Sequence, residues 1–167
     1  MLYMPKKRRI FFISVAMFLT ALIGANVCSA KENLIILVSN QDYQNCEKLI
    51  SDMNKYEVPY TRIDESKIEE YKNEKYMFIL GGPGSGEGMD AVFKKVLSRD
   101  EYSFLQSSGN MDMYLKEDVW VKGQNVMVLG VSDGAQLKDI LIDFRPAWMG
   151  NLVDWFDLDV NWAEYVY

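Results

Sequence analysis

Tyr76–Gly86 reads YMFILGGPGSG, and this stretch decides the fold. Its first part, Tyr76–Leu80, is a continuous apolar run, which is typical of a strand that is covered on both faces. Glycines follow at once, and the apolar residues between positions 89 and 97 then recur at the spacing of an amphipathic helix. Strand, tight turn and helix in this order make one unit of an α/β protein, because glycines let the chain reverse sharply.

The same alternation precedes this unit. Asn33–Val38 (NLIILV) is a second apolar run, and a helical spacing of apolar residues follows it as far as Met53. Val58–Ile63 predicts another short strand, and Ser66 with Glu69 three residues later predicts the start of a helix. We therefore expect an α/β fold: a mostly parallel sheet with flanking helices, in flavodoxin-like strand order.

The next part of the chain predicts an added β-hairpin. Residues 99–110 are polar and mixed, which favours a loop, and Met111–Glu117 is compatible with a strand. Val119–Lys122 and Val126–Val131 have the composition of two paired strands, joined by a turn at residues 123–125.

A last helix and an aromatic tail complete the domain. Asp133 with Gln136 three residues later predicts a capped helix, which Pro146 is expected to end. Residues 147–167 are rich in tryptophan and tyrosine, and Phe156–Trp162 alternates apolar with polar residues, which predicts a docked strand or an extended arm. We expect a single α/β domain over residues 31–167, with residues 147–167 as an aromatic C-terminal arm.

The first thirty residues have the order of a secretory signal peptide. Four basic residues, Lys6–Arg9, precede the uncharged apolar run Ile10–Ala25, and small residues lead to a cleavage site after Ala30. We therefore expect an exported protein, extracellular or at the cell surface. Two alternatives remain open for this segment: an uncleaved membrane anchor, and lipidation of Cys28.

Composition excludes several kinds of chemistry. Histidine is absent, which removes Ser-His-Asp and Cys-His catalysis and histidine zinc sites. Of two cysteines only Cys46 remains after cleavage, and its place on an apolar helix face predicts a core residue. Removing the four basic residues of the N-terminal segment from a total of 18 leaves 14 against 24 acidic residues, a net charge of −10. Such a domain repels nucleic acid.

The glycine-rich turn Gly81–Gly86 fits the first part of a phosphate-binding loop, G-x-x-x-x-G. Glu87 then stands where that loop has the lysine that neutralises phosphate, and Gly88 where it has the residue that holds magnesium. We expect a tight turn from sheet to helix and, as a second interpretation, N–H groups that hold a carboxylate or a sugar hydroxyl. The candidate ligand-binding residues are Gly82, Gly84, Ser85 and Gly86.

No catalytic residue, metal ligand or cofactor is predicted. Asp157, Asp159 and Asn161 have the spacing of the first ligands of a calcium loop. Trp162 occupies the position that needs glycine, and the chain ends before the glutamate that would complete the loop. Alternation along a strand explains the same three residues.

Two segments carry a resemblance to a known family. Ile79–Pro83 (ILGGP) ends a strand, and Val119–Gly130 forms a tryptophan-bearing hairpin that leads into a helix. With these segments the chain resembles, from about Leu34 to Phe144, the α/β domains of archaeal surface-layer and related exported envelope proteins. It is also similar in form to bacterial cell-wall-binding repeats. The resemblance implies a non-catalytic role at the cell surface.

These observations predict an exported, non-enzymatic cell-envelope domain that acts in surface assembly or partner binding. The expected partners are envelope or surface proteins or polymers, with no nucleic acid, and with a membrane only through an uncleaved N-terminal segment. Two alternatives are a small-ligand or glycan-binding module that uses the Gly81–Gly86 loop, and a carboxylate- or metal-dependent hydrolase.

Overall fold

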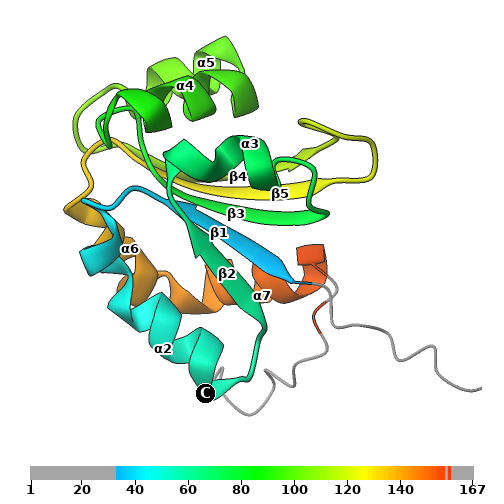
Figure 1. Cartoon of the computed structure of the whole chain (residues 1–167). Helices are drawn as coiled ribbons and strands as arrows, with labels where there is room; N and C mark the ends of the chain where they lie inside the picture. The colour runs from blue at the N-terminus through cyan, green and yellow to red at the C-terminus, as the bar shows by residue number, and fades with distance from the viewer. Residues whose placement is uncertain (1–32, 157, 159–167) are drawn as a thin grey trace, which may run out of the picture. The chain divides into compact units, whose positions relative to one another are not determined.

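A computed structural model describes residues 33–156 and residue 158 of the chain (Figure 1). Within that part, the strands are β1 (Leu34–Val38), β2 (Tyr60–Ile63), β3 (Tyr76–Gly81), β4 (Met111–Glu117) and β5 (Asn125–Val131). The helices are η2 (Tyr43–Cys46), α2 (Glu47–Lys55), η3 (Glu65–Lys67), α3 (Ile68–Tyr71), α4 (Glu87–Val96), α5 (Arg99–Leu105), α6 (Gln136–Asp143) and α7 (Arg145–Phe156).

The strands form one sheet in the order β2-β1-β3-β5-β4. β1 pairs in parallel with β2 and β3, and β3 pairs in parallel with β5, whereas β4 runs antiparallel to β5. The predicted α/β fold with a mostly parallel sheet and flanking helices is confirmed. The first three strands have the flavodoxin-like order β2-β1-β3. The last two strands depart from it: β5 lies beside β3, and β4, which comes earlier in the chain, lies outside β5 as the edge strand.

Helices cover both faces of the sheet, which explains the continuous apolar strands. Leu34, Ile36 and Val38 of β1 face the layer of α2, α6 and α7. Ile35 and Leu37 face the opposite layer, to which α4 contributes. All five residues are fully buried. Figure 1 shows α2, α6 and α7 on one side of the sheet and α3, α4 and α5 on the other.

The hairpin exists, but its first strand differs from the prediction. β5 pairs with Met111–Glu117, and residues 118–124 form the connecting loop. Gln124 accounts for this arrangement, because its side chain is fully buried and donates hydrogen bonds of 2.8 Å to the carbonyl oxygens of Lys72 and Glu74. Its Oε1 accepts the Trp120 N–H at 3.1 Å, which holds the loop away from a strand conformation.

Part of the predicted loop at residues 99–110 is the helix α5. Ser98 and Glu101 form a full capping box: the Ser98 Oγ accepts the Glu101 N–H at 3.3 Å, and Glu101 Oε2 accepts the Ser98 N–H at 2.7 Å. Lys116 on β4 then binds both carboxylate oxygens of Glu101 at 2.6 Å. A short helix with few apolar residues is therefore stabilised by its first turn.

The other two helix starts lie close to their predicted positions. Asp64, rather than Ser66, caps the segment before α3, because its carboxylate accepts the Ser66 N–H at 3.1 Å. Gln136 begins α6, and its Oε1 accepts the Asp133 N–H at 3.0 Å, which is half of the predicted reciprocal pair.

The tail departs from the expected extended arm. Pro146 does not end a helix but lies in the first turn of α7, where a missing backbone N–H leaves no hydrogen bond unmade. Trp148 and Phe156 are buried in the core, and the Trp148 indole donates to the Leu141 carbonyl at 3.1 Å. Residues 147–156 are therefore core helix. The calcium-like residues Asp157, Asp159 and Asn161 lie outside the described residues.

The predicted signal segment, residues 1–30, also lies outside the described residues and stays a prediction. In the part of the chain that is described, none of the helices has the length and apolar character needed to cross a membrane.

Candidate functional site

The carboxyl ends of β1, β3 and β5 meet at one edge of the sheet. From β1 the chain crosses to β2 on one side, and from β3 the later strands lie on the other side. This change of direction makes the gap between β1 and β3 a topological switch point, where open α/β sheets usually bind ligands. The Gly81–Gly86 loop joins β3 to α4 at this edge.

The Gly81–Gly86 loop is a turn that is closed by hydrogen bonds between its own residues. The Gly82 N–H donates to the Ser85 Oγ at 2.9 Å, and the Ser85 N–H donates to the Gly82 carbonyl at 3.0 Å. Ser85 and Gly82 are buried, whereas Gly84 and Gly86 are exposed. The four predicted ligand-binding residues therefore divide into two that hold the turn and two that face solvent.

Two glycines are required by the geometry of the loop. A Cβ at Gly82 would lie 1.7 Å from the carbonyl oxygen of Val131, so the loop packs backbone to backbone against the end of β5. Gly86 has a φ of +111° immediately before α4, a conformation that side-chain-bearing residues rarely adopt. The sheet-to-helix turn expected for these glycines is thus formed.

Asp42 is a site residue that sequence reasoning missed. Its side chain follows β1, is 1% exposed, and has one oxygen, Oδ2, without a hydrogen-bond partner among the described residues. That oxygen lies 3.0 Å from the position that a Cβ on Gly81 would take, and Oδ1 lies 1.9 Å from the equivalent point on Gly134. A buried carboxylate therefore lies beneath the start of the loop. In the sequence, Ser39 indicates a turn that places Asp42 at this edge, because it stands directly after β1. Its hydroxyl accepts the Asp42 N–H at 3.0 Å.

A basic side chain, that of Arg62, also lies near this edge, at the carboxyl end of β2. Arg62 donates from Nη2 to the Val38 carbonyl at 3.3 Å and to Asn40 Oδ1 at 2.6 Å, and its guanidinium lies 4.6 Å from the centre of the Tyr43 ring. Asn40 in turn donates to Asp64 at 3.1 Å. Hydrogen bonds from Ser66 and Asn40 keep the pKa of Asp64 below its usual range. Arg62 on β2 is thus engaged by the end of β1 and by the segment that follows it.

Carboxylates predominate around the turn. Besides Asp42, Glu65 packs its stem against the first turn of α4, where a Cβ on Gly88 would lie 2.2 Å from the Glu65 Cγ. The Glu65 Oε2 is buried and has no partner among the described residues. Within the described ranges, no three acidic or cysteine side chains converge in a way that could hold a metal ion. A phosphate ligand here would need its own counter-cation.

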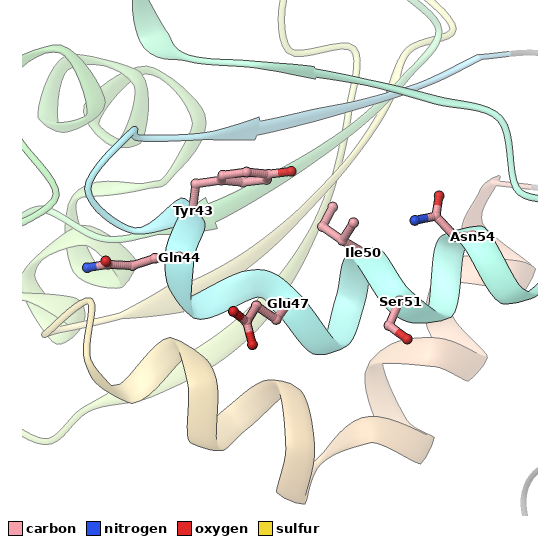
Figure 2. A pocket seen from close by; sticks show the side chains of 6 residues that line it. All are labelled: Tyr43, Gln44, Glu47, Ile50, Ser51 and Asn54. Atoms are coloured by element: carbon pink, nitrogen blue, oxygen red, sulfur yellow. The ribbon is translucent and has the colours of Figure 1, made fainter.

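Two surface pockets lie beside the loop after β1 rather than at the glycine turn. One, of about 520 Å³, runs along η2 and α2. Figure 2 shows its lining side chains along this helical segment, with Tyr43, Ile50 and Asn54 at the upper edge of the view and Glu47 and Ser51 at the lower edge. A second, of about 530 Å³, lies between α2 and α6. Neither is lined by Gly82, Gly84, Ser85 or Gly86.

Cys46 is expected to resist alkylation in the folded protein. The residue is fully buried, as predicted, and burial together with the nearby Asp42 carboxylate raises the pKa of its thiol to about 12. Because the thiolate is the reactive form, iodoacetamide at pH 8 should modify Cys46 only after denaturation. Peptide mapping by mass spectrometry checks this, and prompt labelling in buffer would contradict the buried position.

Comparison with known proteins finds a similarity to part of this chain. No family model and no solved structure matches the chain. It is 29% identical over 105 residues to adenylate kinase isoenzyme 1 of Sus scrofa and, equally, to that of Bos taurus; each match covers 58% of this chain and 52% of the relative. The chain therefore spans about half the length of the curated relatives it matches. A continuous 58% of 167 residues is about 97 residues and includes positions 72–96 wherever it begins, so the matched segment contains the Gly81–Gly86 loop.

This similarity corrects the predicted function. A non-enzymatic envelope domain for surface assembly is wrong, because the relatives are kinases by name. The similarity likewise favours neither the glycan-binding module nor the carboxylate- or metal-dependent hydrolase. The prediction failed because the acid at position 87 and the N-terminal segment both point away from a phosphate-binding loop, although the loop itself follows a strand and opens a helix. The resemblance to surface-layer-type domains stays a prediction.

Proposed function

We propose that this chain is a nucleotide-binding domain of the nucleotide-kinase type. One coincidence carries the proposal: the segment similar to adenylate kinase includes a glycine loop that joins a central strand to a helix at the switch point of the sheet. The N-terminus of α4, a helix of ten residues without a side-chain cap, would offer backbone N–H groups and a partial positive charge to a phosphate.

Phosphoryl transfer is not expected from these residues alone. Glu87 replaces the lysine that reaches the phosphates, and Gly88 replaces the hydroxyl residue that holds magnesium. The buried Asp42 and the nearby Glu65 add negative charge to the same edge. We infer that the loop binds a nucleotide whose phosphates already carry a divalent cation, and that it binds without turnover.

Glu87→Lys is the sharpest test of this proposal. The substitution replaces a repulsive carboxylate by the ammonium that a phosphate loop uses, and a charge-assisted hydrogen bond contributes about 1.5–3 kcal/mol. We expect ATP or AMP with Mg²⁺ to bind the variant at least about tenfold more tightly than the natural chain. Isothermal titration calorimetry on the full chain, with and without Mg²⁺, measures the difference.

Glu47→Lys is the matched control, because it makes the same charge change on α2, outside the loop. It should leave nucleotide affinity almost unchanged. A natural chain that binds no nucleotide with Mg²⁺, together with a Glu87→Lys variant that binds none either, would overturn the proposal. Equal gains in both variants would show only a general charge effect and would also count against a site at the loop.

A further inference from the structure

β4 is an edge strand whose outer side meets no other strand among the described residues. Its seven residues, MDMYLKE, contain neither proline nor glycine, and its pairing with β5 continues without a bulge from Met111 to Glu117. Natural proteins usually protect such an edge with proline, a bulge, charged side chains or a covering segment. Among the described residues β4 has only the charged side chains of Asp112, Lys116 and Glu117, so a pairing strand must offer complementary charges. β4 is therefore open to a further strand.

The pairing with β5 determines which residues of β4 face outward. The Asp118 N–H donates to the Gln124 carbonyl at 2.9 Å, one step beyond the end of the ladder. Because hydrogen-bonded positions alternate along an antiparallel strand, even-numbered residues bond to β5. The Met113 N–H points away from β5, since it donates to the side chain of Asp112 at 2.8 Å. The outward backbone groups belong to Met111, Met113, Leu115 and Glu117.

We propose that two copies of this chain associate by antiparallel pairing of their β4 strands, about a two-fold axis at Tyr114. In this register Asp112 lies opposite Lys116 of the second copy, twice, and Met113 lies opposite Leu115, also twice. Lys116 keeps its ion pair with Glu101 of its own chain, so Asp112 brings a second carboxylate to the same ammonium. Opposite charges and apolar pairs facing each other across strands are both stabilising. The Met113 N–H then exchanges its bond with Asp112 for one with the second strand.

Charge selects this register over its neighbours. A two-fold axis at Met113 would place Asp112 opposite Tyr114 and form no ion pair. An axis at Leu115 would place Asp112 opposite Asp118, two like charges that repel each other. All three registers form hydrogen bonds through the outward backbone groups of the odd-numbered residues. Of the three, only the register with its axis at Tyr114 places opposite charges across from each other.

The apolar side of β4 supports the same occupant. Leu115 is 38% exposed, although it lies in a strand, and Phe144 nearby is 55% exposed. A pocket of about 250 Å³ opens beside Met111 and Met113, under the junction of α6 and α7. Leu115 of a second copy, opposite Met113, would lie at this pocket and cover apolar surface of both chains.

Charge reversal tests the pairing. The mass of the full chain, measured by light scattering over a range of concentrations, should show a monomer–dimer equilibrium. Asp112→Lys should raise the dimer dissociation constant about tenfold or more, because two attractive pairs become repulsive. Combining it with Lys116→Asp should restore dimerisation, while thermal unfolding reports separately on the lost contact between Lys116 and Glu101.

Cross-linking tests the register without reversing a charge. In a Cys28→Ser background, Met113→Cys and Leu115→Cys variants should form an intermolecular disulfide when mixed. Each alone should not, since identical residues would then lie too far apart to be bridged. A monomeric mass at the highest soluble concentration would overturn the proposal. So would a dimer that ignores Asp112→Lys and forms no mixed disulfide, because another surface would then hold it.

Discussion

Gly82→Ala is expected to lower the free energy of unfolding by about 3 kcal/mol, one of the largest effects available to a single methyl group in this chain. The added Cβ would lie 1.7 Å from the Val131 carbonyl oxygen, so backbone must move. Val131 ends the interior strand β5, and Gly82 is tied to Ser85 by two hydrogen bonds, so neither side can yield cheaply. Urea denaturation measures the loss.

Gly84→Ala in the same loop is the matched control. Its Cβ would lie 3.5 Å from the Ser132 carbonyl oxygen, an ordinary contact, and the residue is exposed. Its effect should stay within about 0.5 kcal/mol. Equal stability of the two variants would mean that Gly82 does not pack against β5 as described.

Arg145→Met should destabilise the fold by about 3 kcal/mol at neutral pH. Asp52 on α2 is 1% exposed, and Arg145 binds both of its carboxylate oxygens, at 2.7 and 3.0 Å. Without Arg145, Lys48, at 2.7 Å, would be the one cation left beside this buried charge among the described residues. The pair also connects α2 to the start of α7, so its loss should loosen the packing of the last helix.

The effect of Arg145→Met should shrink in acid. Burial alone would raise the pKa of Asp52, but hydrogen bonds from Arg145 and Lys48 outweigh it and lower the pKa. A lowered folded-state pKa stabilises the protein above the unfolded value of about 3.9. That stabilisation disappears as the pH falls through the folded value. Thermal unfolding of both proteins from pH 7 to pH 3 should therefore show converging stabilities, and a constant difference would contradict the assignment.

The central strands could be predicted because burial on both faces leaves an unbroken apolar run, as in Asn33–Val38 and Tyr76–Leu80. The first strand of the hairpin could not. Val119–Lys122 has good strand composition, yet Gln124 binds carbonyl groups about fifty positions away in the chain, and no local pattern encodes that contact. α5 was missed although its capping box, Ser98 and Glu101, is legible, because the mixed residues after it suggested a loop.

The candidate site divides in the same way. Gly82, Gly84, Ser85 and Gly86 are neighbours in sequence, so their assembly into one turn needed no tertiary information. Asp42 reaches the same edge only because β1 lies beside β3, and strand order is a property of the whole sheet. The sequence likewise showed the acid at position 87 but not the two carboxylates, Asp42 and Glu65, that the fold adds to it.

The reversed direction of β4 has a kinetic consequence. Its pairing with β5 closes only the short loop at residues 118–124, whereas β3 and β5 must meet across more than forty intervening residues. Short-range hairpins form within about 1–10 μs, whereas distant parallel pairs must first overcome a larger loss of chain entropy. β5 is also the second neighbour of β3 in the sheet, on the side opposite β1. During synthesis from the N-terminus, β1, β2 and β3 therefore leave the ribosome with one side of β3 unpaired, and the late hairpin supplies its missing strand.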